Sequence, residues 1–369
     1  MTGVVSIRGT PYGQGDEFVD PPGQILLISF PDMHATGNFS DLVDVTTLDF
    51  TKFDTRTSEL LSGGVRFVYK AGNNSLSNDL EPGSITTTPN SKVAYVVLQK
   101  NNAVAVVDLV TKSITNIYGL GVKDWSKLKM DASDEDGGIH LKSWPIYSYY
   151  LPNDLQYFRH GYRGYLVTAN EGTSVNLTQE VGWSEVLKGY EFIERNLTGP
   201  MVSEEMMSWL ANKADLGSLC FTSRNGEDTN DSFTKFVTFG GRSFSIWRTV
   251  DLRLVFDSGD DMETETAERI PDLFNAGTDA DGTPRSQVDK QSTYRGPRPE
   301  SVAVGRIGDL TVIFIGSGAP GSVFVYSVHK NVSSPKFESV WSSVGNTRNT
   351  WDELFGNRTL RVTDPRQLM

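Results

Sequence analysis

The sequence is poor in cysteine, in basic residues and in long apolar stretches. A single cysteine among 369 residues excludes an internal disulfide and the usual paired-cysteine zinc motifs. No apolar run reaches the length of about 18 residues that a transmembrane helix needs. The 34 Lys and Arg residues stand against 46 Asp and Glu residues, for a net charge of −12. This balance argues against a general nucleic-acid-binding protein, which needs a basic face.

Glycine and proline are plentiful, and they punctuate short apolar strands. The chain has 35 Gly, 16 Pro and 11% aromatic residues, a composition typical of a turn-rich β protein. Residues 93–98 and 103–109 are β-branched runs on either side of a polar loop, which predicts a β-hairpin. A third run at 113–118 follows directly, so the sequence predicts a β-meander there.

Similar groups of strands recur further along the chain. One group comprises residues 311–315, 322–326 and 337–341, and another comprises 236–239, 244–247 and 252–256. Residues 24–28 predict one strand of an incomplete group, and residues 165–169 predict an isolated strand. Repeated units of three or four strands are typical of propeller blades. We therefore expect an all-β fold: one β-propeller domain over 1–369, incomplete at both ends, with helical and loop insertions.

The insertions fall at about residues 54–64, 173–235 and 257–298. The first reads as a short helix that ends at Gly63 or Gly64. The second contains a longer helix over 203–214, with Ser203 as N-cap and Met206, Met207 and Leu210 on one face. The third is polar and without a clear period, so the sequence predicts a long loop.

Several familiar catalytic and nucleotide-binding motifs are absent, or occur without the secondary structure that they need. Residues 316–321 match G-x-G-x-x-G, but a dinucleotide site needs a helix next, and residues 322–328 form a β-branched run instead. The pattern therefore predicts a hairpin turn. The sequence contains no P-loop, HExxH or GxSxG motif. Four scattered histidines lack metal-ligand spacing: His34, His140, His160 and His329.

Carboxylates are the better candidates for a site. Residues 131–138 hold four acids before two glycines, and residues 279–282 form a D-x-D-G turn. Oxygen ligands on a tight turn suit calcium, although neither segment has the acid that an EF-hand needs at position twelve. The best candidates for an ordered cation site are Asp131, Asp134 and Asp136. The alternative is an acidic surface turn that binds no metal.

A second concentration of negative charge lies between Asp257 and Asp281. This window has nine acids and one arginine, a net charge of −8. Such a field attracts cations, or it keeps a loop solvated.

Seven N-x-S/T sequons exceed the roughly three that chance predicts for this composition. Most of them fall in expected loops, where a glycan can be carried. They favour a secretory route, and they lie at Asn38, Asn73, Asn176, Asn196, Asn230, Asn331 and Asn357.

An ordered series of motifs resembles a known family. The segments lie at residues 80–82, 92–108, 131–137, 144–145, 168–172, 239–247, 255–260 and 296–302. Together they are similar to the choice-of-anchor I propeller proteins of bacteria and to the mesenchyme-specific cell-surface glycoproteins of animals. The resemblance spans about residues 12–365. It implies that the chain is incomplete at both ends, with the signal peptide and anchor outside this fragment.

The resemblance implies an extracellular or cell-surface glycoprotein linked to biomineralisation. Calcium, a mineral surface and extracellular matrix proteins are then the expected partners. It also suggests that Glu81, Glu171 and Glu300 converge as cation ligands at the central face of the propeller.

The chain departs from the family pattern at three places. Gly83 and Arg298 stand where the pattern has acids, and residues 173–175 are uncharged. If those acids hold metal in the family, part of the site is lost here.

Two other functions stay open. Some bacterial relatives are described as alkaline-phosphatase-like, so one alternative is a metal-dependent phosphomonoesterase in which Arg242 clamps a phosphate. Glu171, Asp257 and Asp260 would then serve as metal ligands or bases. Another alternative is a protein-interaction propeller without metal. No role is predicted for Cys220.

Overall fold

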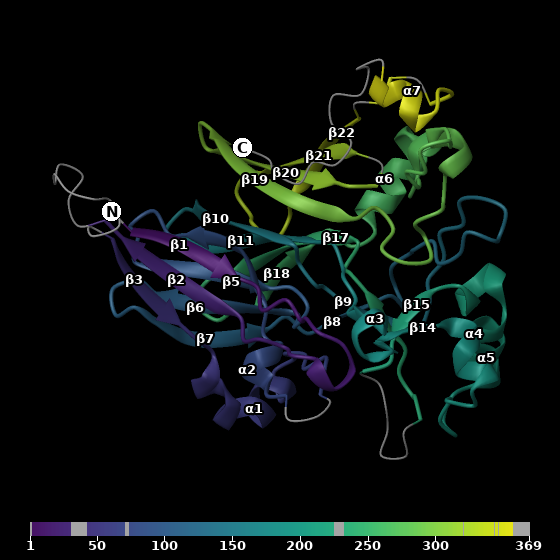
Figure 1. The fold of residues 1–369 in the computed structure, drawn as a ribbon. Coiled ribbons are helices and arrows are strands. Elements are labelled where there is room, and N and C mark those ends of the chain that lie inside the picture. Colours follow the sequence, from purple (N-terminus) through teal and green to yellow (C-terminus); the bar gives the residue numbers. More distant parts are fainter. Residues whose placement is uncertain are drawn as a thin grey trace. The chain divides into compact units, whose positions relative to one another are not determined.

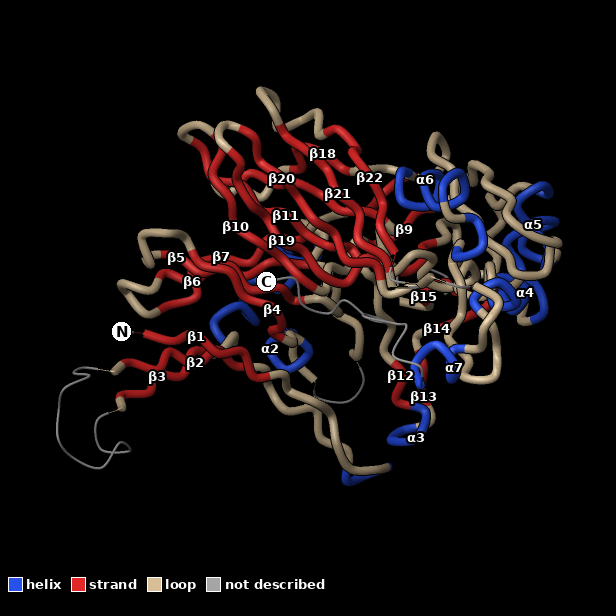
Figure 2. The backbone as a smooth tube through the Cα atoms, turned by 90° about the horizontal axis from the view of Figure 1, so that it is seen from above, coloured by secondary structure: helices blue, strands red, loops and turns tan. Residues whose placement is uncertain are grey.

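The structure is a computed structural model, and it describes residues 2–30, 43–70, 74–224, 232–319, 321–342, 344–345 and 347–356. The chain forms two compact units. Unit 1 comprises Met1–Gly121 and Leu177–Ser184, and unit 2 comprises Val122–Asn176 and Glu185–Met369. Each unit is described separately below. Both are built mainly from β-strands, most of them in antiparallel sheets (Figure 2).

Unit 1 contains two antiparallel meanders. The strands β1 (Thr2–Ile7), β2 (Gln24–Ser29) and β3 (Asp44–Leu48) form a three-stranded sheet. The other sheet, whose strands are labelled in Figure 2, has four strands in sequence order: β4 (Pro82–Thr87), β5 (Val93–Leu98), β6 (Ala103–Asp108) and β7 (Ser113–Gly119). The predicted hairpin and meander at 93–118 are thereby confirmed.

Short helices accompany the sheets of unit 1. The predicted helix at 54–64 is confirmed as a 3-10 turn, Thr51–Arg56, that continues into α1 (Thr57–Ser62). It ends where predicted: Gly63 is the C-cap, and Gly64 has a φ of +92°, which favours glycine. The remaining helices are the 3-10 turn Gly15–Glu17, α2 (Leu76–Asp79) and α3 (Thr178–Val181).

Unit 2 contains two four-stranded antiparallel sheets (Figure 1). One has the order β10 (Asp154–His160), β11 (Arg163–Asn170), β17 (Ser243–Arg248), β18 (Leu254–Asp257). The other has β19 (Pro299–Ile307), β20 (Leu310–Ser317), β21 (Ser322–Val328) and β22 (Lys336–Ser342) in sequence order. The turn after β20 leads into a strand, which confirms the hairpin prediction for residues 316–321. Apolar side chains of both sheets share one core cluster, among them Val167, Ile246, Ile313 and Phe324.

A mixed five-stranded sheet completes the β structure of unit 2. Its order is β14 (Val186–Lys188), β15 (Cys220–Thr222), β16 (Val237–Phe239), β9 (Tyr147–Tyr149), β8 (Val122–Asp124). The pair β16–β9 is parallel, and the other pairs are antiparallel. Two short strands, β12 (Asn176–Leu177) and β13 (Trp183–Ser184), form a separate pair, in which Leu177 and all of β13 belong to unit 1.

The predicted grouping of the strands between 236 and 256 is wrong. The strand β16 belongs to the five-stranded sheet, whereas β17 and β18 extend the sheet of β10 and β11. The chain changes sheets at Gly240, whose φ of +85° turns the backbone between β16 and β17. The strand at 165–169, predicted to be isolated, is the inner strand β11 of a four-stranded sheet.

The loop predicted for 257–298 is also wrong in part. It contains α6 (Asp261–Arg269) and two 3-10 turns, Pro271–Leu273 and Pro284–Gln287. The helix escaped prediction because it buries only Met262, Glu263 and Thr266 and therefore has no apolar stripe. Unit 2 also has α4 (Gly189–Glu194), α5 (Glu204–Ala211), a π turn at Lys213–Gly217 and α7 (Trp351–Gly356).

The start of α5 is capped as the sequence predicts. The Ser203 side chain accepts a hydrogen bond from the Met206 backbone N–H, and Met206 and Leu210 are buried. Met207 is half-buried. We expect Ser203→Ala to lower the free energy of unfolding by about 1 kcal/mol, because one N–H at the helix start loses its acceptor. Urea denaturation measures this loss, and a Ser203→Asp variant that fails to keep wild-type stability would contradict the capping role.

Candidate carboxylate cation site

The acidic segment at 131–138 is a closed loop in unit 2. The backbones of Met130 and Lys142 pair across its base. Inside the loop, the Asp131 carboxylate accepts hydrogen bonds from the backbone N–H groups of Ser133 (3.3 Å) and His140 (2.6 Å). The two glycines have φ values of +94° and +143°, which a side chain would oppose. The loop therefore holds Asp131 in a fixed position.

Three carboxylates meet beside this loop. One ligand oxygen from each of Asp131, Asp136 and Asp289 lies within 4.8 Å of the others. Asp131 and Asp289 are buried and Asp136 is half-buried. The sequence predicted Asp131 and Asp136. Asp134 instead directs its carboxylate to the Lys290 Nζ at 3.1 Å.

Asp289 was not among the site residues predicted from the sequence. It is a lone acid in a polar stretch, and its approach to Asp131 brings together residues far apart in the chain. Its φ of +75° is unusual for a non-glycine residue. No local motif in the sequence predicts the approach of Asp289 to Asp131 or its positive φ.

The triad is electrostatically costly without a cation. Burial, together with the Asp289 charge, raises the pKa of Asp131 to about 7. Burial, together with the charges of Asp136 and Asp134, raises the pKa of Asp289 to about 7. Among the described residues, no Lys or Arg forms an ion pair with Asp131 or Asp289. The His140 Nδ1 lies 3.1 Å from an Asp136 oxygen, and the sequence predicts no role for this half-exposed ring.

These residues fit a hard divalent cation. Calcium takes oxygen ligands, about 6–8 of them, from carboxylates, carbonyls and water. Three carboxylates would supply part of that set and would neutralise the ion, with water completing the shell. A soft thiolate-binding metal does not fit this donor set.

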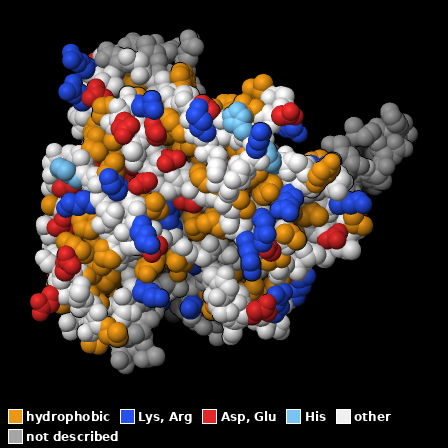
Figure 3. Space-filling view, turned by 180° about the vertical axis from the view of Figure 1, so that it is seen from behind, with side chains coloured by type: hydrophobic (Ala, Val, Ile, Leu, Met, Phe, Trp, Pro, Cys, Tyr) orange, Lys and Arg blue, Asp and Glu red, His pale blue; other side chains and the backbone are white. Residues whose placement is uncertain are grey.

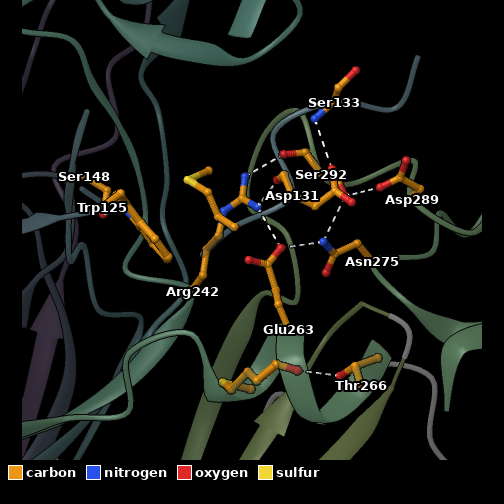
Figure 4. A network of polar contacts seen from close by, with 12 residues as sticks. Trp125, Asp131, Ser133, Ser148, Arg242, Glu263, Thr266, Asn275, Asp289 and Ser292 are labelled. Atoms are coloured by element: carbon orange, nitrogen blue, oxygen red, sulfur yellow. Dashed lines mark hydrogen bonds and ion pairs between the residues drawn. The ribbon is translucent and has the colours of Figure 1, made fainter. Parts of the chain in front are cut away.

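A buried arginine lies behind the triad, as Figure 4 shows. The Arg242 guanidinium donates to the Asp131 carbonyl (2.7 Å), to Glu263 Oε1 (2.9 Å) and to the Ser292 carbonyl (2.5 Å). The side chains of Arg242 and Glu263 are 0% and 1% exposed. Burial raises the pKa of Glu263, and Arg242 opposes the rise.

The network continues from Glu263 to the triad (Figure 4). The Asn275 amide donates to Glu263 Oε1 (2.7 Å) and to Ser292 Oγ (2.9 Å). The Ser292 hydroxyl in turn donates to Asp289 Oδ1. An unbroken chain of hydrogen bonds thus runs from the buried ion pair to a carboxylate of the triad.

The geometry does not favour a phosphate clamp at Arg242. Its side chain is wholly buried, and both terminal nitrogens are engaged within the protein. Asp257 accepts from Ser243 and Ser245 and lies 2.9 Å from the Lys123 Nζ. Asp260 accepts from the Lys129 backbone N–H at 2.8 Å. Each of these groups has a structural partner.

The glutamates expected to bind a cation are paired with basic side chains. Glu171 lies 2.5 Å from Arg295 and 4.0 Å from Arg298. Arg298 also bonds to Glu300, so it joins the two glutamates. In unit 1, Glu81 lies 2.5 Å from the Lys100 Nζ. A paired glutamate suits a cation less well than the triad does.

The remaining expectations concern the surface and the thiol. Asn176, Asn196 and Asn331 are exposed, as a glycan requires. Asn38, Asn73, Asn230 and Asn357 lie outside the described residues.

Cys220 is buried in β15, and burial raises the pKa of its thiol, so the thiol is poorly reactive. Figure 3 shows acidic and basic side chains interspersed over one face of the molecule.

The chain is thus a mostly β protein of several antiparallel sheets, with a carboxylate cluster that two acids of a closed loop form with Asp289. It belongs to the choice-of-anchor I family: residues 2–331 match the choice-of-anchor I domain. The family expected from the sequence motifs is thereby confirmed.

Two curated proteins are similar to it. The "Mesenchyme-specific cell surface glycoprotein" of Strongylocentrotus purpuratus is 32% identical over 311 residues, which cover 78% of this chain and 40% of that protein. "Gigasin-3a" of Magallana gigas is 30% identical over 155 residues, which cover 42% of this chain and 55% of that protein. The aligned part is therefore about half, or less, of each relative's length.

Comparison with solved structures adds little. The hydrazine synthase of Kuenenia stuttgartiensis aligns over 77% of this chain and 72% of that one, with 15% identity and a TM-score of 0.15. A likeness this weak carries no argument. Among the described residues, no helix has both the length and the apolar character to span a membrane.

Proposed function

We propose that this chain is part of a secreted or cell-surface glycoprotein that binds calcium at a mineral or extracellular matrix surface. The similarity to a cell-surface glycoprotein over 78% of the chain supports the location. Three exposed sequon asparagines are consistent with glycosylation. The observation that carries the calcium proposal is the meeting of Asp131, Asp136 and Asp289 within 4.8 Å.

The sheets support the finer proposal of a β-propeller. Two of the four-stranded sheets consist of strands that pair in sequence order, as in propeller blades. In both sheets, β4–β7 and β19–β22, each strand pairs with the next one along the chain, and every pair is antiparallel. In this arrangement the loops that connect the strands would gather at the blade ends.

The proposed mechanism is electrostatic. In the part of the chain that the structure describes, no Lys or Arg pairs with Asp131 or Asp289, so a calcium ion would relieve the repulsion among the three carboxylates. Because only three side chains supply ligands, the rest of the shell would be water, and the ion could exchange with a surface. Matrix proteins that present further carboxylates are the expected partners.

Calcium titration tests the proposal. We expect wild-type protein to bind about one calcium ion at the triad, and Asp289→Asn or Asp136→Asn to weaken that binding at least tenfold, because each variant removes a charged ligand. Isothermal titration calorimetry with calcium chloride at pH 7.5 measures the affinities. The matched control is Asp134→Asn, which removes the same charge from a side chain that pairs with Lys290.

The outcomes separate the candidate functions. Equal losses in the Asp134 control and the triad variants would mean a diffuse acidic field and no ordered site. Absence of calcium binding in wild type would favour a protein-interaction role. Hydrolysis of p-nitrophenyl phosphate that requires a divalent metal would favour the phosphomonoesterase.

A further inference from the structure

A second site lies at one end of the β10–β11–β17–β18 sheet in unit 2. The β10–β11 hairpin and the β17–β18 turn end at the same edge, because Tyr165 pairs with Arg248 across the ladder. Between them is a cavity of about 390 Å³, in the lower part of the ~300–1,000 Å³ range of small-molecule sites. Its lining residues are Arg163, Gly164, Tyr165, Arg248, Thr249 and Val250.

The two turns that form the cavity are tied together. Thr249 donates a hydrogen bond from its hydroxyl to the Gly164 carbonyl at 3.0 Å. A Cβ on Gly164 would lie 2.8 Å from the Tyr157 ring and 2.9 Å from the Thr249 hydroxyl. Glycine therefore permits the close approach of the two turns that shapes the site.

Two arginines line the cavity, and they differ in whether their guanidinium group is already paired. Arg248 is held by Asp251, which accepts from its Nε at 3.1 Å and from its Nη2. Arg163 is exposed, and its side chain forms no hydrogen bond or ion pair within the described residues. A guanidinium offers a planar fork that matches a carboxylate or sulfate. In a chain of net charge −12, an unneutralised arginine in a cavity is notable.

Two exposed residues with apolar surface are neighbours of these arginines in the chain: Tyr162 precedes Arg163, and Val250, which lines the cavity, lies two residues after Arg248. Tyr162, at the tip of the β10–β11 hairpin, is 97% exposed, and Val250 is 77% exposed. Tyrosine combines an apolar ring face with a polar hydroxyl, so it suits a ligand that is partly apolar and partly polar. A sugar ring has this mixed character, and its acidic substituent would reach the arginines.

We propose that this cavity binds an acidic saccharide, with its carboxylate or sulfate group on Arg163 and Arg248 and its ring against Tyr162. This site is distinct from the carboxylate triad in charge and in residues. It does not depend on the calcium proposal, since a calcium-free protein would keep it.

Binding to defined oligosaccharides tests the assignment. The probes are a heparin hexasaccharide for sulfate and a polygalacturonate hexasaccharide for carboxylate, with a neutral dextran oligosaccharide as reference. We expect one acidic probe to bind in chelator-containing buffer, and Arg163→Gln to weaken it at least tenfold, because a charge-assisted bidentate contact is lost. Tyr162→Ala should weaken it about threefold or more.

The control is Arg195→Gln, which removes the same charge at the end of α4, away from the β10–β11 hairpin in both ribbon views (Figures 1 and 2). Arg195 is 58% exposed, so neither variant should disturb folding. Binding unchanged in Arg163→Gln, or reduced equally in Arg195→Gln, would overturn the proposal. Equal affinity for dextran or for a polyglutamate peptide would overturn the saccharide assignment, and failure of both acidic probes to bind more tightly than about 1 mM would overturn the site.

Discussion

Replacing Arg242 by methionine is expected to lower the free energy of unfolding by about 3–5 kcal/mol. Methionine keeps much of the apolar stem but removes every donor. Glu263, whose side chain is 1% exposed, would lose its ion-pair partner. The carbonyl oxygens of Asp131 and Ser292 would each lose a hydrogen bond in the interior. A loss of this size is a large share of the ~5–15 kcal/mol by which proteins are stable.

Guanidinium denaturation of wild type and variant measures the loss. The double variant Arg242→Met, Glu263→Gln removes the unpaired charge as well, so it should recover about 1–2 kcal/mol relative to Arg242→Met alone. The surface variant Arg195→Gln serves as control and should change stability by less than about 0.5 kcal/mol. A loss below about 1 kcal/mol in Arg242→Met would refute the structural role of the buried pair.

The strands and helix ends that were predicted correctly depend only on residues close together in the sequence. The β-branched runs at 93–98 and 103–109 became β5 and β6 because such residues favour extended strands, and most of their side chains are buried. The cap at Ser203 and the stop at Gly63 also follow from a few neighbouring residues. These features need no knowledge of distant contacts.

The site depends on contacts that no local pattern records. The hydrogen bond from Arg242 to Asp131 joins positions 111 residues apart. Asp289 reaches Asp131 from a stretch that has neither apolar period nor motif. The sequence therefore indicated the acidic loop, but it predicted Asp134 as the third carboxylate of the group, whereas the structure brings Asp289 to Asp131 and Asp136.

Arg298 illustrates how a departure from the family pattern acquires a physical meaning. The pattern has an acid at this position, and this chain has a base between Glu171 and Glu300. Two glutamates that share an arginine repel each other less than two that share none. Here the position stabilises the fold through ion pairs, and the triad is left as the better candidate for a cation.

Asp289→Asn is expected to stabilise the calcium-free protein at high pH, by an amount that falls at lower pH and when calcium is added. Burial raises the pKa of Asp289 in the folded protein to about 7 from about 3.8. The folded state thus holds this proton more tightly than the unfolded state does, so the Asp289 contribution falls as pH rises from about 4 to about 7. At pH 8 in chelator, asparagine removes that cost, and the variant should be more stable by about 2–4 kcal/mol.

The comparison at pH 5 and the addition of calcium complete the test. At pH 5 the folded wild type carries a neutral Asp289 but the unfolded chain is already ionised there, so the advantage of the variant should shrink to about 1–2 kcal/mol. With calcium at about 100 times its Kd at pH 8, wild type should gain about 2.7 kcal/mol, while the variant, with its weakened site, gains much less. The measurement is urea denaturation across this grid of conditions. A variant less stable than wild type at pH 8 in chelator would refute the raised pKa. If calcium stabilised both proteins equally, Asp289 would not be a ligand.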